Sequence, residues 1–273
     1  MVEVLVHFVA PVLVGVLIGV ASGLLGIGGG TVMVPIFRLA FGMSATMSTA
    51  TSLFAIIPTS ISGAISHVKG KTCIPALGIA AGLGGACMSP IGVWLAQLSP
   101  DWLVMLAAAL IIGYSAINMF KKAFKLRPAS QPAAGVDAAA STADDSSLSR
   151  KQLLQGAAIG LVAGLASGYV GVGGGFIMVP LMLSIIGIPM RKASGTSLIA
   201  VMILAIPGVI EQGIIGNINY LAGIAIVVGT IPGAVIGARL VTKVPERTLR
   251  LLFGCFLIVA AVMLVLNEVG IFG

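Results

Sequence analysis

The sequence is built from two copies of one pattern, set 145 residues apart. Met33–Pro35 in the first copy corresponds to Met178–Pro180 in the second, and the same offset holds without a gap from Gly15 to Pro100. The glycines of the first copy that recur in the second are Gly15, Gly19, Gly23, Gly26, Gly28, Gly29 and Gly30. Shared apolar composition would give scattered matches and not one constant register. The fold must therefore contain two similarly built halves.

The chain has too few charged residues to cover a water-facing surface. Only 8% of its residues are charged and 58% are hydrophobic, whereas a soluble domain carries about 25% charged residues. The net charge of +7 does not indicate a nucleic-acid partner, because Lys and Arg in a membrane protein mainly report orientation. Cys73, Cys87 and Cys255 form no spaced pair, so we expect no metal and no cofactor. The predicted fold class is an all-α polytopic membrane protein.

Each copy divides into five apolar segments. They are 5–25, 30–42, 47–67, 73–97 and 102–122 in the first half, and 152–170, 175–188, 193–215, 218–241 and 247–267 in the second. The second segment of each half, with about 13 residues, is too short to span a membrane alone. It follows a glycine run that should break a helix. No basic residue precedes the first segment, so we expect it to be a membrane segment and not a signal peptide.

The two copies are separated by a stretch rich in Ala, Ser, Asp and Pro that has no apolar period. Such a composition predicts disorder. We therefore divide the chain into a first transmembrane repeat (1–125), a disordered cytoplasmic linker (126–150) and a second transmembrane repeat (151–273).

The first two segments of each half can form one broken crossing, two crossings or a re-entrant hairpin. One broken crossing gives an even number of crossings per half, and the other two give odd numbers and therefore inverted repeats. With the linker ends in the cytoplasm, an even number leaves seven of the fifteen Lys and Arg residues outside, whereas inversion leaves only Arg38. The positive-inside rule favours inversion, with both termini outside. Charge does not separate two crossings from a hairpin, but the short second segment favours a hairpin near the midplane.

The glycine run before each short segment is a candidate anion site. Backbone N–H groups left unpaired in mid-membrane are costly unless they meet a ligand, and a helix start carries partial positive charge. The candidate binding residues are Gly28, Gly29, Gly30 and Thr31 in the first half and Gly173, Gly174 and Gly175 in the second. Pro35 and Pro180, five residues after each triple glycine, are assigned a structural role. The alternative is that the glycines only allow close helix packing, the role we assign to Gly15, Gly19 and Gly23, where Gly15→Ala is expected to be mild.

A second candidate set is rich in hydroxyl groups and opens the third segment of each half. It comprises Thr51, Ser52, Ser194, Thr196 and Ser197. Two interpretations remain open, namely helix capping and back-bonding, or donation to an oxyanion. Replacing Thr51 and Thr196 together by Val should separate them, because a hydrogen bond to a charged group contributes about 1.5–3 kcal/mol.

These motifs resemble those of the sulfite exporter family called TauE/SafE, or four-toluene-sulfonate uptake permeases. The resemblance rests on GLLGIGGGTVMVP at 23–35, GYVGVGGGFIMVP at 168–180, ATSL at 50–53 and GTSL at 195–198. It implies a multi-pass protein of the bacterial cytoplasmic membrane that moves sulfite, sulfoacetate, other organosulfonates or related anions, mostly outward. The family is described with seven or eight helices, whereas the charge count favours an odd number of crossings per half.

We therefore expect an exporter of small anions and not an enzyme. Moving an anion out of a negative interior gains about 2.3 kcal/mol per 100 mV, so export needs no coupling ion. The expected partners are the anionic substrate and the lipid bilayer, with no nucleic acid, and a homodimer is left open. The alternatives are a membrane accessory protein that transports nothing, and an importer of related sulfur or organic anions coupled to a cation.

Overall fold

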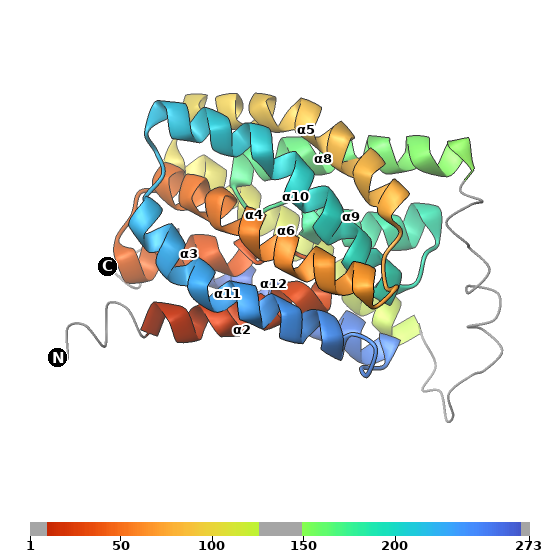
Figure 1. The fold of residues 1–273 in the computed structure, drawn as a ribbon. Coiled ribbons are helices and arrows are strands. Elements are labelled where there is room, and N and C mark those ends of the chain that lie inside the picture. The colour runs from red at the N-terminus through yellow and green to blue at the C-terminus, as the bar shows by residue number, and fades with distance from the viewer. Residues whose placement is uncertain (1–9, 126–148, 269–273) are drawn as a thin grey trace.

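The computed structural model describes residues 10–125 and 149–268, and every apolar segment predicted from the sequence is helical in it (Figure 1). The linker predicted over 126–150 lies outside the described residues, except for its last two. Ser149 accepts a hydrogen bond from the backbone N–H of Lys151 and forms a capping box with Gln152, so Arg150 starts a helix.

The described helices keep the order of the predicted segments. The first half contains α2 (Ala10–Leu25), α3 (Gly30–Phe41), α4 (Ala45–Lys69), α5 (Pro75–Leu98) and α6 (Asp101–Lys125). The second half contains α8 (Arg150–Val170), α9 (Gly175–Leu181), the π-helical segment η2 (Met182–Ile186), α10 (Met190–Ile215), α11 (Tyr220–Leu240) and α12 (Glu246–Glu268). When α9 and η2 are taken as one segment, all bounds except the start of α2 lie within three residues of the predicted ones.

Seven of the described helices are long and apolar enough to cross a membrane. They are α4, α5, α6, α8, α10, α11 and α12. The shorter apolar helices of the described chain are Pro11–Leu25, Gly30–Phe41 and Gly175–Ile186. By length and composition, the chain is an all-α polytopic membrane protein, as predicted.

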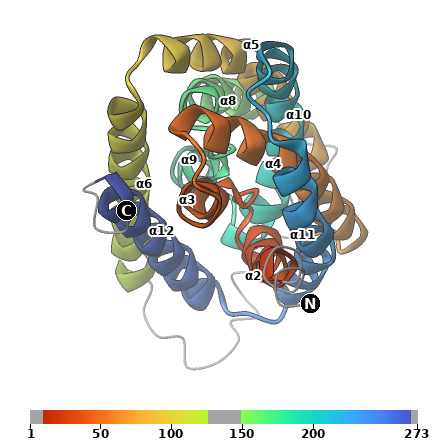
Figure 2. The same ribbon diagram turned by 90° about the vertical axis from the view of Figure 1, so that its left-hand side faces the viewer.

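The short helices that follow the glycine runs lie at the centre of the bundle. Figure 2 shows α3 and α9 surrounded by the longer helices, with α6 and α12 packed on each other at one edge. The side chains of Met33, Val34 and Phe37 on α3 are fully buried, as are Phe176 and Met178 on α9. The glycine runs that precede these helices are therefore held deep inside the protein.

Glycine stripes bring α2 against α11 and α8 against α5. A Cβ added to Gly15 would lie 2.5 Å from the carbonyl oxygen of Ile226, and one added to Gly23 would lie 2.1 Å from that of Ala234. The packing role predicted for this stripe is confirmed. The expectation that Gly15→Ala would be mild is wrong, because the atom that a Cβ meets is backbone and cannot rotate away.

The duplication extends to the contacts between the halves. The hydroxyl oxygen of Thr51 on α4 accepts a hydrogen bond from the N–H of Asn219 at the start of α11 (3.0 Å). Its counterpart Thr196 on α10 accepts one from the N–H of Ile74 at the start of α5 (2.9 Å). Asn219 follows the end of α10, and Ile74 follows the end of α4. The start of α4 therefore lies beside the end of α10, and the start of α10 beside the end of α4, so these two helices run antiparallel.

The two ends of the described chain lie on the same side of the bundle. In Figure 1, α2 begins and α12 ends at the left, whereas α6 ends and α8 begins at the right, which we call the linker side. Among the described Lys and Arg residues, all except Arg38 lie in helix turns or loops on the linker side. Basic charge is thus concentrated at one end of the bundle.

Candidate functional site

Each glycine run forms a loop that only glycine adopts without strain. Gly28 and Gly29 have φ values of 75° and 84°, and Gly173 and Gly174 have values of 88° and 67°. These values lie in the left-handed region, which residues with a Cβ adopt at a cost. Gly29 and Gly174 occupy the N-cap positions of α3 and α9, and neither offers a side chain to cap the helix. The starts of both helices are therefore bare backbone.

The two glycine loops touch each other. A Cβ on Gly30 would lie 2.5 Å from the carbonyl oxygen of Val172, and a Cβ on Gly175 would lie 2.5 Å from that of Gly26. All residues of both loops are buried. The starts of α3 and α9 thus meet in the interior, at a place that neither half could form alone.

Backbone N–H groups at this meeting point have no acceptor in the described part of the chain. In the first loop they belong to Ile27, Gly28, Gly29, Gly30 and Thr31, and in the second to Val172, Gly173, Gly174 and Phe176. Buried backbone N–H groups are nearly always paired, because leaving one without a partner costs as much as a lost hydrogen bond. A cluster of such donors needs an acceptor that the described chain does not supply.

Buried hydroxyl groups without a described partner flank the first loop. The Oγ of Ser60 on α4 lies 3.4 Å from where a Cβ on Gly28 would be, and the Cβ of Ser22 on α2 lies 3.6 Å from the corresponding position on Gly29. Both serines are fully buried, and neither hydroxyl has a hydrogen-bond partner among the described residues. The same holds for Ser167, the counterpart of Ser22 in the second half.

Sequence reasoning missed these three serines. A signal was present for two of them, because Ser22 and Ser167 repeat the same polar position in otherwise apolar segments. Ser60 has Ala205 at the equivalent position, so the duplication gave no indication of its role.

The structure divides the predicted hydroxyl set. Thr51 and Thr196 accept the helix-start hydrogen bonds described above, so capping is the role that their contacts support. Ser194 donates to the carbonyl of Met190, and Ser197 donates to that of Gly26 at 2.6 Å.

One residue of the hydroxyl set and one residue of the first glycine run have unpaired hydroxyl groups. Ser52 and Thr31 are fully buried, and their hydroxyls have no hydrogen-bond partner among the described residues. They therefore stay candidates for ligand binding.

The two prolines assigned a structural role lie inside the short helices. Pro35 is buried in α3 and Pro180 in α9. A proline inside a helix removes one N–H and leaves a carbonyl of the preceding turn unpaired. The carbonyl of Pro180 itself accepts a hydrogen bond from the Nζ of Lys122 on α6 at 3.1 Å and one from the hydroxyl of Ser184 at 2.6 Å.

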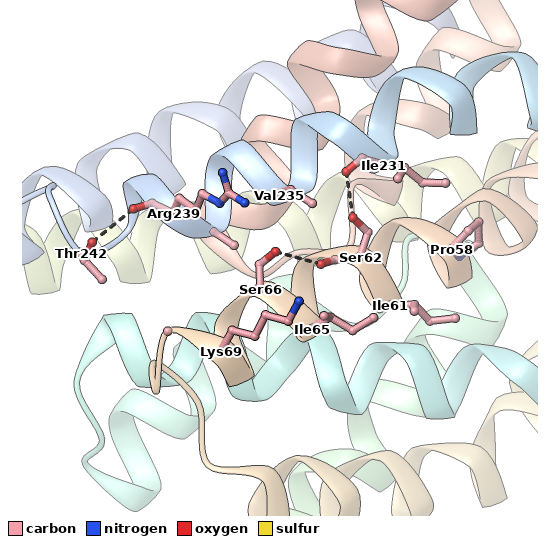
Figure 3. A pocket seen from close by; sticks show the side chains of 12 residues that line it. Pro58, Ile61, Ser62, Ile65, Ser66, Lys69, Ile231, Val235, Arg239 and Thr242 are labelled. Atoms are coloured by element: carbon pink, nitrogen blue, oxygen red, sulfur yellow. Dashed lines mark hydrogen bonds between the residues drawn. The ribbon is translucent and has the colours of Figure 1, made fainter.

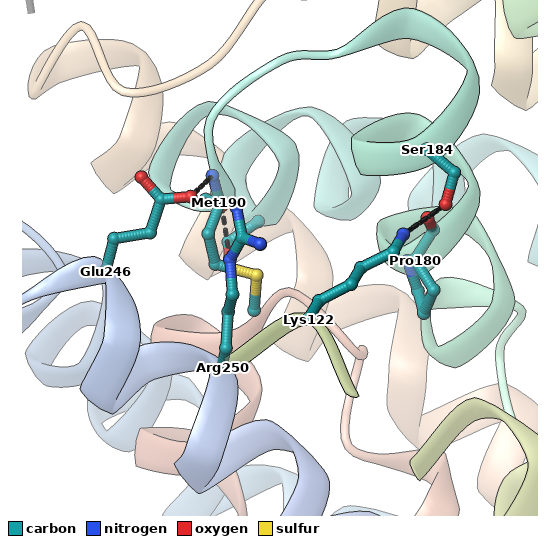
Figure 4. Close-up of polar contacts among 7 residues, drawn as sticks. Lys122, Pro180, Ser184, Met190, Glu246 and Arg250 are labelled. Carbon is teal, nitrogen blue, oxygen red and sulfur yellow. Dashed lines mark hydrogen bonds and ion pairs between the residues drawn. The ribbon is translucent and has the colours of Figure 1, made fainter. Parts of the chain in front are cut away.

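Lys122 belongs to a group of charged residues at the linker-side end of α9 (Figure 4). It also donates to the hydroxyl of Ser184. Glu246 at the start of α12 accepts from the N–H of Met190 (3.4 Å) and pairs with Arg250. These contacts fasten α6 and α12 to the start of α10 and the end of α9. Lys122 and Arg250 thus bring two cations and Glu246 one carboxylate to this end of α9.

The lining of the glycine loops is otherwise apolar. The side chains nearest to the positions of added Cβ atoms on Gly28, Gly173 and Gly174 belong to Ile56, Val201 and Leu204. Among the described residues, no group of three or more His, Cys, Asp or Glu side chains could hold a metal ion. The loops therefore offer N–H and O–H donors in apolar surroundings, and such donors stabilise negative charge.

The sequence of this chain matches a known protein family. The sequence profile described as sulfite exporter TauE/SafE matches residues 12–264. The chain belongs to the TauE/SafE sulfite exporter family. It is therefore a membrane protein of a transporter family and not an enzyme.

Curated bacterial relatives support the assignment over the whole chain. Probable membrane transporter protein YunE of Bacillus subtilis (strain 168) is 28% identical over 97% of this chain and 99% of its own length. Probable membrane transporter protein YdhB of the same organism is 28% identical over 88% of this chain and 92% of its own. A probable membrane transporter protein of Haemophilus influenzae is 29% identical over 93% of this chain. No solved structure matches the chain.

Proposed function

We propose that this protein exports small oxyanions, with sulfite or organosulfonates such as sulfoacetate as the substrates, and that it binds them between the two glycine loops. The observation that carries the proposal is the cluster of buried N–H donors at the starts of α3 and α9, which lack an acceptor in the described chain. A sulfite or sulfonate group presents three oxygens to such donors. Charged acceptors make stronger hydrogen bonds than neutral ones.

The buried hydroxyls extend this donor set. Ser22 and Ser60 lie next to the first loop, and each has a spare O–H group. A hydrogen bond to a charged group contributes about 1.5–3 kcal/mol, so each serine that reaches the anion contributes to affinity. Neutral donors bind an anion without a permanent ion pair, so the substrate can also be released.

The proposed route requires the two halves to be inverted repeats, with α2–α3 and α8–α9 as hairpins that enter from opposite sides. Three features support this. α4 and α10 run antiparallel, the described chain begins and ends on the side opposite the linker ends, and three long helices in each half follow the short pair. The bare helix starts would then approach the membrane midplane from both sides, as in other transporters built from inverted repeats.

The orientation follows from charge. We assign the linker side to the cytoplasm because the described Lys and Arg residues, apart from Arg38, gather there. Outward movement of one anion gains about 2.3 kcal/mol per 100 mV of a negative interior. The membrane potential alone can therefore drive export.

The test is flux in proteoliposomes that contain the full chain. Labelled sulfite and sulfoacetate should move down an imposed potential faster than in empty liposomes, and chloride should move at the empty-liposome rate. No flux of any sulfur oxyanion above empty liposomes would contradict the proposal and favour an accessory role. Flux that requires a cation gradient would favour coupled import.

A further inference from the structure

A groove runs between α4 and α11 on the linker side (Figure 3). It has a volume of about 820 Å³. One hydrogen bond joins the two helices across the groove, from the hydroxyl of Ser62 on α4 to the carbonyl of Ile231 on α11 (2.8 Å), and the hydroxyl of Ser66 donates to the carbonyl of Ser62 within α4 (3.2 Å). The hydroxyl groups of Ser62 and Ser66 thus already donate hydrogen bonds within the protein.

The walls of the groove follow the same pattern on both helices. On α4 they are formed by Ile61, Ile65 and Lys69, and on α11 by Ile231, Val235 and Arg239. Each row places two apolar side chains and then a cation at intervals of four residues, which lie on one face of a helix. Each row spans about 12 Å at 1.5 Å per residue. The groove is therefore apolar along two turns and positive at its linker-side end.

The two cations have no partner within the described chain. Neither Lys69 nor Arg239 makes a side-chain hydrogen bond or ion pair with a described residue, and no acidic residue lines the groove. Both are exposed. Their charges are thus available to an external anion.

The second copy of the pattern serves as an internal comparison. The residues equivalent to Lys69 and Arg239 are Ile214 on α10 and Trp94 on α5, on the opposite side of the bundle. Both are exposed, with relative accessibilities of 83% and 56%. The packing of α10 against α5, which corresponds to that of α4 against α11, therefore does not require a cation at either position. The pair of cations is present only at the linker-side groove and not at its counterpart in the other half.

We infer that this groove binds one anionic phospholipid of the leaflet on the linker side. The isoleucine and valine walls fit the upper part of an acyl chain, and Lys69 and Arg239 fit the phosphate of the head group. Basic pockets between membrane helices bind anionic lipid head groups. A small sulfonate has no part that would use two turns of apolar wall, so lipid fits the groove better than substrate does.

The experiment is native mass spectrometry of the detergent-purified full chain with added phosphatidylglycerol or phosphatidylethanolamine. Wild type should retain phosphatidylglycerol in preference to phosphatidylethanolamine. The double variant Lys69→Gln/Arg239→Gln should bind phosphatidylglycerol about thirty-fold more weakly, which corresponds to about 1 kcal/mol per cation at 1.4 kcal/mol per tenfold.

A matched control separates this site from general linker-side charge. Lys71→Gln/Lys243→Gln removes the same charge from the loops that follow the two groove helices, and should retain the lipid like wild type. Equal loss in both double variants, or no loss in either, would overturn the inference. Two arms test the apolar walls. Ile65→Trp should fill the groove and weaken retention, and glycerol 3-phosphate should not displace the lipid at equal concentration. Unchanged retention in Ile65→Trp, or displacement by glycerol 3-phosphate, would also overturn the inference.

Discussion

Alanine at Gly30 or Gly175, where the two glycine loops touch, should weaken anion binding as well as lower the stability of the fold. Gly30 and Gly175 start α3 and α9 without a positive φ, so the effect of a methyl group there is steric. Each added Cβ would meet a backbone carbonyl of the other loop at 2.5 Å, whereas ordinary contact begins at 3.4 Å. The loops must therefore move apart by about 0.9 Å. Overpacking of this kind costs about 1–3 kcal/mol.

The same displacement should break hydrogen bonds to the substrate. An N–H···O bond of about 2.9 Å that lengthens by that amount is no longer a hydrogen bond. We expect Gly30→Ala and Gly175→Ala each to weaken anion binding at least tenfold, because one lost charge-assisted bond contributes about 1.5–3 kcal/mol. The melting temperature should fall by about 2–12 °C, because an overpacking cost of about 1–3 kcal/mol lowers it by about 2–4 °C per kcal/mol in chains of this size.

Two control glycines separate the steric effect of an added methyl group from the effect of a positive φ. Gly42→Ala tests positive φ alone, because Gly42 has φ 62° and open space around it. Gly113→Ala tests neither effect, because Gly113 lies inside α6 with nothing within 4 Å of an added Cβ, so it should be neutral or slightly stabilising.

The assay is isothermal titration with sulfite and sulfoacetate, together with thermal unfolding and proteoliposome flux at matched protein amounts. Both controls should bind like wild type. If Gly30→Ala and Gly175→Ala also bind and transport normally, the loops do not hold the anion and the glycines serve packing alone.

Ser22→Ala/Ser167→Ala should weaken anion affinity about tenfold or more without lowering the melting temperature, because neither hydroxyl has a described partner to lose; a stability loss with unchanged affinity would make both serines structural. Thr51→Val/Thr196→Val should lower the melting temperature, because the N–H groups of Asn219 and Ile74 lose their acceptors, at a cost of about 1–3 kcal/mol each. Loss of anion affinity at unchanged stability would instead show that the two threonines bind the ligand. An engineered Ser141→Cys should resist impermeant thiol reagents in intact cells and react in inverted vesicles, and labelling from outside would contradict the proposed orientation.

The helices could be predicted from sequence because lipid imposes simple rules on length and apolarity. The ends of α4 to α6 and α10 to α12 follow from apolar runs bounded by Pro, Gly or charged residues. The duplicated register also identified the glycine runs as breaks before α3 and α9. These features are local, so a single sequence carries them.

The contacts across the halves could not be predicted in the same way. That Thr51 caps α11 and Thr196 caps α5 depends on which helices become neighbours, and apolar patterns do not encode neighbours. The packing of Gly15 against the backbone of Ile226 has the same origin. Small residues at regular spacing show that a helix packs closely, but not how closely. The assignment of Thr51 and Thr196 to ligand binding lacked this information.

The pattern of backbone contacts also decides which helices can move separately. α2 and α11 touch through glycines along the whole stripe, as do α8 and α5. Interfaces of this kind leave no flexible side chains to absorb sliding. Each rigid pair therefore combines one helix from each half, and the boundary between moving parts does not coincide with the boundary between the repeats. The glycine loops continue directly from α2 and α8, so a displacement of either pair shifts one loop against the other. If the anion binds at the glycine loops, as proposed, such a displacement would change access to the buried N–H donors, because the two loops touch each other.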